Sequence, residues 1–292
     1  MTKNFLLAFI GGSGVYQIEE LKNQKWINVS TPWGAPSDKI LTGTFNNNKV
    51  LFLPRHGRLH IYNPSEINYR ANIYALKKLG ATDIISLSAC GSLKENLSPG
   101  TFVLVDQFID KTIGRKKTFF EEGIVAHLSM ANPTSKLVRD ACVEVLKKLK
   151  IKHQNKATYI VMEGPQFSTK AESESYRKQN IDVIGMTNMP EAKLAREAEI
   201  RYATVAMVTD YDCWHSKHDD VDVEQIIKTL NKNSNKAKSL VKNIINVLPK
   251  YINKEKDLAE NILDKSIITQ KKDWNKKTKK KLDVILKRYL EK

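Results

Sequence analysis

Side chains that can hold an anion follow four short apolar runs that lie far apart in the sequence. They are the Ser13 hydroxyl within Gly11-Gly12-Ser13-Gly14, Arg55 with His56, Ser88 with Ala89, and Thr187. Arg55 presents a planar charged fork that suits phosphate, His56 can add one donor, and small residues let backbone N–H groups approach an anion. Taken alone, each motif has a simpler explanation, such as a tight turn or a basic surface loop. Taken together, they predict one phosphate-binding site.

Two carboxyl side chains, Asp210 and Asp212, follow another apolar run, Tyr202 to Thr209. In a pocket, carboxylates recognise amino groups and ring nitrogens, and a carboxyl whose pKa is raised by desolvation can act as a general acid. The alternatives are a cap in a solvated acidic turn, or a metal site shared with His215 and residues 218–220. The spacing argues only weakly for a metal, and we expect none.

Two further motifs are incomplete. His56 and His60 are four residues apart, but a zincin motif needs glutamate directly after the first histidine, where Gly57 stands. Counted from Gly12, a dinucleotide-binding fingerprint needs glycine where Gln17 stands. A nucleotide-dependent oxidoreductase therefore remains an alternative, one that leaves most of the anion-binding set unexplained.

Short strands alternating with helices would position these residues. The expected strands are Phe5–Ile10, Val50–Leu53, Ile84–Ser88, Phe102–Val105, Tyr159–Met162, Ile181–Met186 and Tyr202–Thr209. Helix-start signals, each a capping residue with glutamate three positions later, are Asn63 with Glu66, Thr169 with Glu172, and Asn188 with Glu191. The pattern predicts an α/β fold, which binds ligands at the carboxyl ends of its strands.

Composition and charge narrow the class of protein. The chain has 292 residues, of which 41% are hydrophobic and 27% charged, which excludes a disordered, collagenous or coiled-coil protein. Three widely spaced cysteines suggest neither disulfides nor a zinc ribbon, and no apolar run is long enough for a signal peptide or a membrane span. We therefore expect a cytoplasmic protein with no membrane partner.

The positive charge is concentrated near the end of the chain. The net charge is +16, and residues 228–253 and 254–292 each carry +6 of it. A nucleic-acid-binding module is therefore an alternative function for this region. Because the lysines are not interleaved with aromatic residues, a solvated helical face is the better interpretation.

Six motifs, in this order, resemble those of the 5'-methylthioadenosine phosphorylases, a branch of the purine nucleoside phosphorylases. They are Gly11-Gly12-Ser13-Gly14, Arg55-His56-Gly57-Arg58, Ala89-Cys90-Gly91-Ser92-Leu93, Glu163-Gly164-Pro165-Gln166-Phe167-Ser168, Met186 to Ala192, and Thr209-Asp210-Tyr211-Asp212-Cys213-Trp214. The resemblance runs from about Phe5 to Val247. It implies a single nucleoside phosphorylase domain over residues 1–249, with a mixed, distorted central sheet flanked by helices. It also implies a homotrimer that uses inorganic phosphate as cosubstrate, with no cofactor and no metal. Residues 250–292 are expected to form a basic, helical extension.

The resemblance also implies roles for individual residues. Phosphate is expected to contact Ser13, Arg55, His56, Ser88, the backbone of Ala89, and Thr187. The ribose is expected to lie on Met186, and the purine against Phe167, Ser168, Asp210 and Asp212. The 5' substituent is expected to contact Val223 and Ile226, with His127 contributed across the trimer interface.

The implied reaction is the phosphorolysis of 5'-methylthioadenosine to adenine and 5-methylthioribose 1-phosphate, a pentosyl transfer of purine and methionine salvage. Arg55 is expected to hold phosphate bidentately. Asp210, if protonated, would donate to purine N7 and accept from the 6-amino group, while Asp212 would hold the loop. Adenosine and 5'-methylthioinosine are the alternative substrates.

Overall fold

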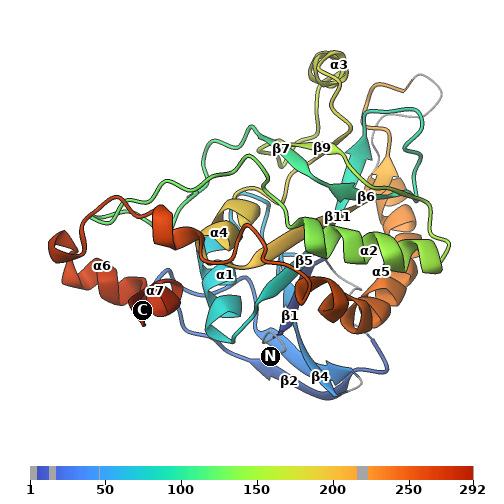
Figure 1. Ribbon diagram of the computed structural model, residues 1–292. Coiled ribbons are helices and arrows are strands. Elements are labelled where there is room, and N and C mark those ends of the chain that lie inside the picture. The colour runs from blue at the N-terminus through green and yellow to red at the C-terminus, as the bar shows by residue number, and fades with distance from the viewer. Residues whose placement is uncertain (1–4, 13–17, 46, 216–222, 292) are drawn as a thin grey trace.

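The computed structural model describes residues 5–12, 18–45, 47–215 and 223–291, and a twisted sheet runs through its centre (Figure 1). The strands are β1 (Leu7–Gly11), β2 (Lys22–Ile27), β3 (Ile40–Phe45), β4 (Asn48–Pro54), β5 (Asp83–Ser92), β6 (Phe102–Val105), β7 (Gln107–Asp110), β8 (His153–Gln154), β9 (Thr158–Val161), β10 (Val183–Gly185) and β11 (Arg201–Asp210). The helices are α1 (Tyr69–Lys78), α2 (Lys136–Lys148), α3 (Lys170–Lys178), α4 (Glu191–Glu197), α5 (Val223–Ile252), α6 (Lys276–Lys281) and α7 (Asp283–Leu290), with short 3₁₀ turns η1 (Ile262–Lys265) and η2 (Lys271–Asp273).

Strand β5 is the centre of the sheet. It runs parallel to β1 along residues 83–86 and parallel to β11 along residues 83–91, and its last residues pair with β10 in the antiparallel sense. From β5 one path leads through β1, β4 and β3 to β2, another through β10 and β9 to β7, and a third through β11 and β6 to β8. Because β5 exchanges β1 for β10 partway along, the sheet is both mixed and distorted, which confirms the expected fold class.

All seven expected strands are present, but the helix starts differ in detail. Thr169 and Glu172 form the reciprocal capping box at the start of α3. Asn63 and Glu66 also bond reciprocally, yet they close a single turn, and α1 begins later with Asn68 as its cap. The apolar pattern runs through both the turn and the start of α1, so the sequence does not show that the turn and the helix are separate.

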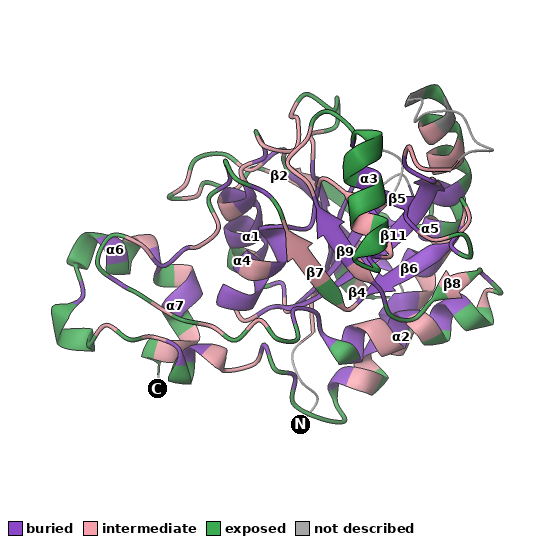
Figure 2. Ribbon diagram, turned by 90° about the horizontal axis from the view of Figure 1, so that it is seen from above, coloured by how far each residue is buried: buried purple, intermediate pink, exposed green. Residues whose placement is uncertain are grey.

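Two apolar cores lie on opposite faces of the sheet. On one face, α1 and α4 pack together, and the C-terminal segment covers them with Leu263, Leu282 and Leu286. On the other face, α2 and α5 pack against each other and against β11. Figures 1 and 2 show the two helix groups flanking the strands, with α6 and α7 at the edge of the molecule. Apart from the start of α5, the helices thus leave the carboxyl ends of the strands uncovered.

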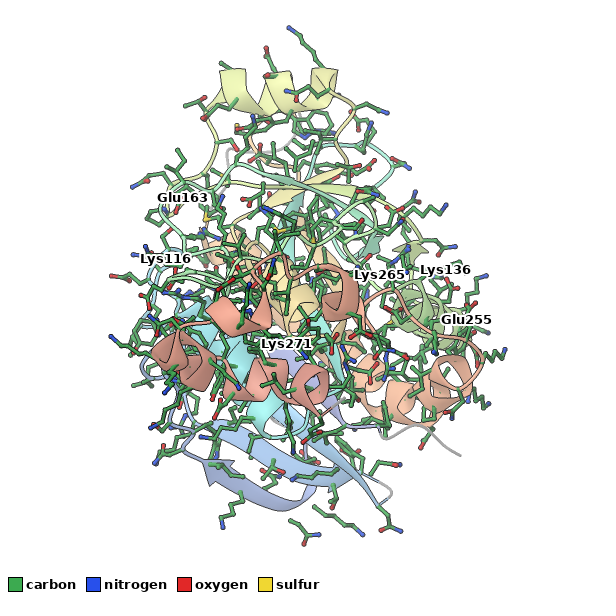
Figure 3. The ribbon with its side chains drawn as sticks, turned by 60° about the vertical axis from the view of Figure 1, so that its left-hand side comes forward. Lys116, Lys136, Glu163, Glu255, Lys265 and Lys271 are labelled. Atoms are coloured by element: carbon green, nitrogen blue, oxygen red, sulfur yellow. The ribbon has the colours of Figure 1, made fainter. Side chains whose placement is uncertain are left out.

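The C-terminal segment is attached to the body through ion pairs as well as apolar contacts. Arg201 pairs with Asp83 of β5 at 2.6 Å and with Glu260 at 2.7 Å, and Arg288 donates to Glu199. The boundary expected at residues 249 and 250 falls inside α5, which continues to Ile252. Figure 3 shows Lys265 and Lys271 on this segment, and both residues are exposed. The basic tail therefore packs with one face and presents lysines on the other.

Among the described residues, none of the helices combines the length and the apolar character needed to cross a membrane.

Helix α4 carries a buried carboxyl, Glu197, that joins the loop containing Thr118 and Phe119 to the helix. Glu197 accepts hydrogen bonds from the Phe119 N–H and the Thr118 hydroxyl, each at 2.6 Å. Burial raises the pKa of Glu197 to about 7, although these two hydrogen bonds partly oppose the rise. The folded protein therefore binds a proton at this carboxyl more tightly than the unfolded chain does.

We expect wild type to be more stable than Glu197→Gln at low pH, and we expect this difference in unfolding free energy to decrease as pH rises. The difference in unfolding free energy should be largest below the ordinary glutamate pKa. It should then decrease by at most about 3 kcal/mol as pH passes through 7, because the folded state must give up the proton. Urea unfolding of both proteins at pH 5 and pH 8 measures this difference. A difference that does not change with pH would contradict the assignment.

Candidate active site

A cavity of about 580 Å³ opens at the carboxyl ends of the strands. Its lining comes from the loop after β4, the end of β5, the turn after β10, the end of β11, the segment after β9 and the start of α5. The predicted site residues that line it are Arg55, His56, Phe167, Ser88, Ala89, Met186, Thr187, Asp210, Asp212 and Ile226. The structure thus brings together residues that are up to 171 positions apart.

Four predicted residues do not line the cavity as described. Ser13 and the side chain of Val223 lie outside the described residues. Ser168 lies behind the wall, where its hydroxyl contacts the Met162 sulfur at 3.8 Å. His127 is exposed on the surface of this chain, with its backbone N–H bonded to the Ser266 carbonyl. Its expected role belongs to a neighbouring subunit and stays a prediction.

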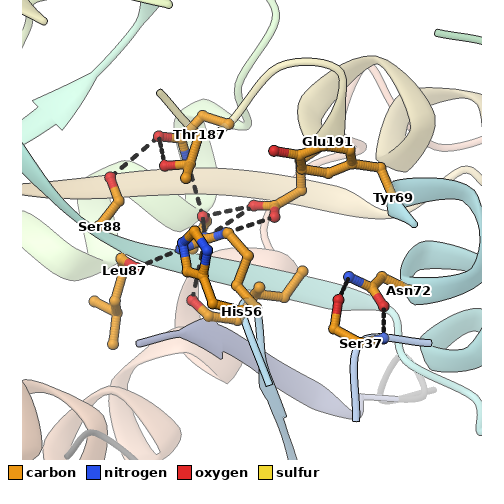
Figure 4. Close-up of polar contacts among 12 residues, drawn as sticks. Ser37, His56, Tyr69, Asn72, Leu87, Ser88, Thr187 and Glu191 are labelled. Atoms are coloured by element: carbon orange, nitrogen blue, oxygen red, sulfur yellow. Dashed lines mark hydrogen bonds and ion pairs between the residues drawn. The ribbon is translucent and has the colours of Figure 1, made fainter. Parts of the chain in front are cut away.

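Arg55 is a buried cation whose paired donors are already engaged. Its side chain is only 2% exposed. Its Nε donates to Glu191 Oε2 at 2.9 Å and Nη2 to Oε1 at 3.2 Å, while Nη1 donates to the Leu87 carbonyl (Figure 4). The fork that we expected to hold phosphate bidentately therefore holds Glu191. What Arg55 offers the cavity is its charge and one remaining Nη1 proton.

Glu191 is the anion that makes this burial possible. It also accepts hydrogen bonds from the Ser86 hydroxyl at 2.7 Å and the Tyr202 hydroxyl at 2.8 Å. Burial works to raise its pKa, but Arg55 and the two hydroxyls outweigh it and hold the pKa below the ordinary value. Glu191 is therefore ionised, and the pair is neutral overall.

Asn188 connects this pair to the hydroxyls of the cavity. Its Nδ2 donates to Ser86 at 2.8 Å and to Tyr202 at 2.9 Å, while its Oδ1 accepts from Ser88 at 3.1 Å and from Thr187 at 3.4 Å. Figure 4 shows the last two contacts. The network fixes the cavity hydroxyls relative to the buried cation.

This arrangement corrects one helix-start prediction. Asn188 does not cap α4, because its side chain is committed to the polar network and its φ is +75°. The N-cap position is Pro190, which makes no side-chain cap, and Glu191 turns inward to Arg55 instead of back to the helix start. A helix does begin where the sequence signal placed it, but Asn188 and Glu191 form hydrogen bonds in the site instead of capping the helix.

His56 is neutral and oriented. Burial, and then the charge of Arg55, lowers the pKa of His56 to about 4. Its Nδ1 lies 2.9 Å from the Tyr62 carbonyl oxygen, which accepts only from a protonated nitrogen. In the neutral ring Nε2 therefore carries the lone pair, so His56 is an acceptor at this nitrogen rather than the donor expected from the sequence.

The carboxyls at the end of β11 form the opposite, acidic part of the cavity. Asp210 accepts from the Thr209 hydroxyl at 2.7 Å and from the Asp212 N–H at 2.8 Å. Burial raises the pKa of Asp210, although these two donors oppose it. A Cβ atom at Gly91 would come within 2.8 Å of its carboxylate, so glycine makes room for it.

Asp212 contributes more than its backbone. Burial, together with the charge of Asp210, raises the pKa of the Asp212 carboxyl. Its Oδ2 is buried and has no hydrogen-bond partner within the described ranges. A buried carboxyl oxygen without a partner, in a residue that lines a cavity, is suited to accept a hydrogen bond from a ligand.

Arg115 was missed by sequence analysis. Its buried guanidinium donates to the carbonyls of Met186 at 2.8 Å, Met189 at 2.7 Å and Glu163 at 2.8 Å. It thereby joins the turn after β10 to the segment after β9. Arg115 lies in an irregular loop with no periodic pattern, so no local signal could have identified it.

In the described part of the chain, no three histidine, cysteine, aspartate or glutamate side chains converge as a metal site would require.

Comparisons with known proteins agree on a family. A model described as the phosphorylase superfamily matches residues 6–246. The chain is 53% identical over 285 residues to S-methyl-5'-thioadenosine phosphorylase of Rhodospirillum rubrum, covering 98% of this chain and 97% of the relative. The match therefore includes most of the tail, beyond the span on which the sequence resemblance rested.

Solved structures give the same result. A methylthioadenosine phosphorylase from an antarctic soil metagenomic library superposes with a TM-score of 0.91 at 46% identity, covering 97% of this chain and all of that one. Methylthioadenosine phosphorylase from Schistosoma mansoni, in complex with adenine, gives 0.81 at 31% identity, covering 97% and 98%.

Replacing Glu191 with glutamine tests the dependence of the site on the buried ion pair. We expect Glu191→Gln to lower the unfolding free energy by about 3 kcal/mol, because the Arg55 charge loses its counterion in a desolvated position. Urea unfolding measures the change. Glu291→Gln is the matched control, since Glu291 pairs with Lys287 at 4.0 Å on the surface and should have little effect. Equal effects of the two substitutions would refute this role for the pair.

Proposed function

This chain belongs to the phosphorylase superfamily, and from that premise we propose that it catalyses the phosphorolysis of 5'-methylthioadenosine. The products are adenine and 5-methylthioribose 1-phosphate, so the enzyme is a pentosyltransferase of purine and methionine salvage. The observation that carries the proposal is a single cavity with a cation and hydroxyl donors at one part and two buried carboxyls at another. The named relatives support the same activity.

The cationic part of the cavity is proposed to bind inorganic phosphate as cosubstrate. Arg55 supplies charge and one Nη1 donor, and the hydroxyls of Ser88 and Thr187 and the Ala89 backbone supply further donors, with Ser13 joining them as the resemblance implies. The neutral His56 accepts a hydrogen bond at Nε2 from the hydroxyl of a singly protonated phosphate. This contact leaves the negative charge on the other phosphate oxygens, one of which attacks the sugar.

The acidic part is proposed to bind adenine. A protonated Asp210 donates to purine N7, and the unpartnered Oδ2 of Asp212 accepts from the 6-amino group. This division differs from the sequence-based expectation, in which Asp210 made both contacts. The hydrogen bonds of the two side chains favour it, because both Asp210 oxygens already accept hydrogen bonds while Asp212 Oδ2 accepts none from the residues described.

The proposed reaction exchanges one bond to C1' for another. A phosphate oxygen forms a bond to C1' while the C1'–N9 bond breaks and its electron pair moves into the purine. The Asp210 proton passes to N7, so that neutral adenine leaves. The sugar carries positive charge in the transition state, which the adjacent phosphate stabilises. No cofactor or metal is needed for these steps.

The sugar and its 5' substituent are proposed to lie between the two parts. Met186 lines the cavity next to Thr187 and suits the ribose, and Phe167 suits the purine ring. Met207, Ile226 and Leu230 present apolar side chains that suit a methylthio group. Val223 is proposed to join them, as the resemblance implies.

We propose that the enzyme works as a cytoplasmic homotrimer. The apolar side chains of Leu59 and Ile113 are 84% and 89% exposed, and Ile61 from the same loop as Leu59 lines the cavity and is exposed too. Exposed apolar side chains near a cavity are typical of a subunit interface. His127 of a neighbouring subunit would then reach the 5' side of the site.

A panel of nucleosides tests the reaction and the 5' pocket together. We expect adenine release from 5'-methylthioadenosine that requires phosphate, with kcat/KM at least about tenfold higher than for adenosine. The apolar side chains leave a 5'-hydroxyl without a partner, which costs about 1 to 3 kcal/mol on burial. Release that does not depend on phosphate would contradict the proposed reaction. Equal efficiency on the two nucleosides would contradict the pocket alone.

Replacing Asp210 with asparagine tests recognition of the base. We expect Asp210→Asn to lower kcat/KM for 5'-methylthioadenosine at least about a hundredfold, because the amide is no acid for N7. The amide N–H₂ suits N7 and O6 of a 6-oxopurine, so activity on 5'-methylthioinosine should be retained or improved. Steady-state kinetics on both substrates measures the switch. A parallel loss of both activities with a lower melting temperature would mean that Asp210 only stabilises the turn.

A further inference from the structure

Tyr159 of β9 carries a buried hydroxyl that nothing described so far uses. The residue has no exposed surface, and its ring packs against Phe108 with centroids 5.8 Å apart. Its hydroxyl oxygen has no hydrogen-bond partner among the residues described. Buried polar groups are nearly always paired, so a hydroxyl left without a partner needs an explanation.

The hydroxyl lies directly behind the wall of the cavity. A Cβ atom added to Gly185 would overlap the Tyr159 oxygen and would lie 3.5 Å from the Ala89 carbonyl. Gly185 itself lines the cavity, between Ile184 and Met186. Glycine at this position therefore gives the phenol its place beside the residues expected to bind phosphate.

The phenol is a donor, and acceptors lie near it. Burial raises the pKa of Tyr159 above its ordinary value, while the hydroxyls of Ser88 and Thr187 are close enough to oppose the rise. Tyr159 therefore keeps its proton at neutral pH. As the structure stands, both of those hydroxyls donate to Asn188 Oδ1.

We propose that Tyr159 is a positioning residue of the phosphate site, which donates to the hydroxyl oxygen of Ser88 or Thr187 when those hydroxyls turn toward phosphate. A hydroxyl can donate one hydrogen bond and accept another, so Tyr159 can complete a chain that ends on the anion. Hydrogen bonds in such a chain polarise one another, which strengthens the last bond. The phenol thus gains its partner only in the phosphate-bound state. The inference rests on the proposed function.

Tyr159→Phe tests this role, because it removes one oxygen and keeps the ring. We expect the Kd for inorganic phosphate, measured by titration calorimetry without nucleoside, to rise roughly fivefold. The KM for phosphate should rise in parallel, while the KM for 5'-methylthioadenosine stays within about twofold. The melting temperature without phosphate should be unchanged or higher, since the variant no longer buries an unpaired hydroxyl.

Tyr74→Phe is the matched control. Tyr74 is also buried, but its hydroxyl donates to Asp283 at 2.6 Å where α1 meets α7, on a helical face of the sheet. This variant should lower the melting temperature and leave phosphate binding unchanged. If Tyr159→Phe behaves in the same way, the role of Tyr159 is structural and the proposal is wrong.

The wild-type enzyme separates this proposal from the proposed function. If wild type binds phosphate but releases no adenine, the proposed function fails, and the change in Kd still tests Tyr159. If wild type binds phosphate and releases adenine while Tyr159→Phe keeps the wild-type Kd, only the role of Tyr159 fails. If wild type does not bind phosphate, both are overturned.

Discussion

The buried ion pair of Arg55 and Glu191 is the interaction on which the site depends. An arginine with 2% of its side chain exposed requires a counterion in contact, because an unpaired charge at that depth is strongly unfavourable. Glu191 can provide it only because α4 begins where the chain leaves the edge of the sheet after β10. Glu191 also accepts hydrogen bonds from the hydroxyls of Ser86 and Tyr202. Asn188 bonds to Ser86 and extends the network to the cavity hydroxyls. The pair thus orients groups that never touch it.

The pairing of Arg55 with Glu191 also affects the electrostatic potential in the cavity. A guanidinium whose fork is paired with a carboxylate presents a moderate positive potential and one free donor, so an anion must be held mainly by hydroxyls and backbone groups around it. At the other part of the cavity, burial raises the pKa of two neighbouring carboxyls. The cation and the two carboxyls thus lie at separate parts of the cavity. This separation lets one site bind an anion and also offer a proton, because a free cation beside Asp210 would lower its pKa and keep it ionised.

The helices and the tail support the site without entering most of it. The two apolar cores hold β5 and β11 in register along their length, and the register shifts only between Val208 and Asp210, where the carboxyl turns toward the cavity. Arg201 at the first residue of β11 fixes the strand to β5 through Asp83 and to the tail through Glu260. Packing of the tail is thus linked through one strand to the residue proposed to protonate the base.

The sequence by itself determined seven of the described strands, the class of fold and the polar residues at strand ends that the cavity brings together, because apolar runs followed by polar residues are local patterns and strand ends meet at one edge of a sheet. It did not determine what those residues do with their hydrogen bonds. Glu191 was expected at a helix start and pairs with Arg55, His56 was expected to donate to the anion and donates to the Tyr62 carbonyl instead, and Arg115 gave no signal. Only the tertiary structure decided these roles, because each depends on burial and on partners up to 136 positions away. Local sequence patterns carry neither quantity.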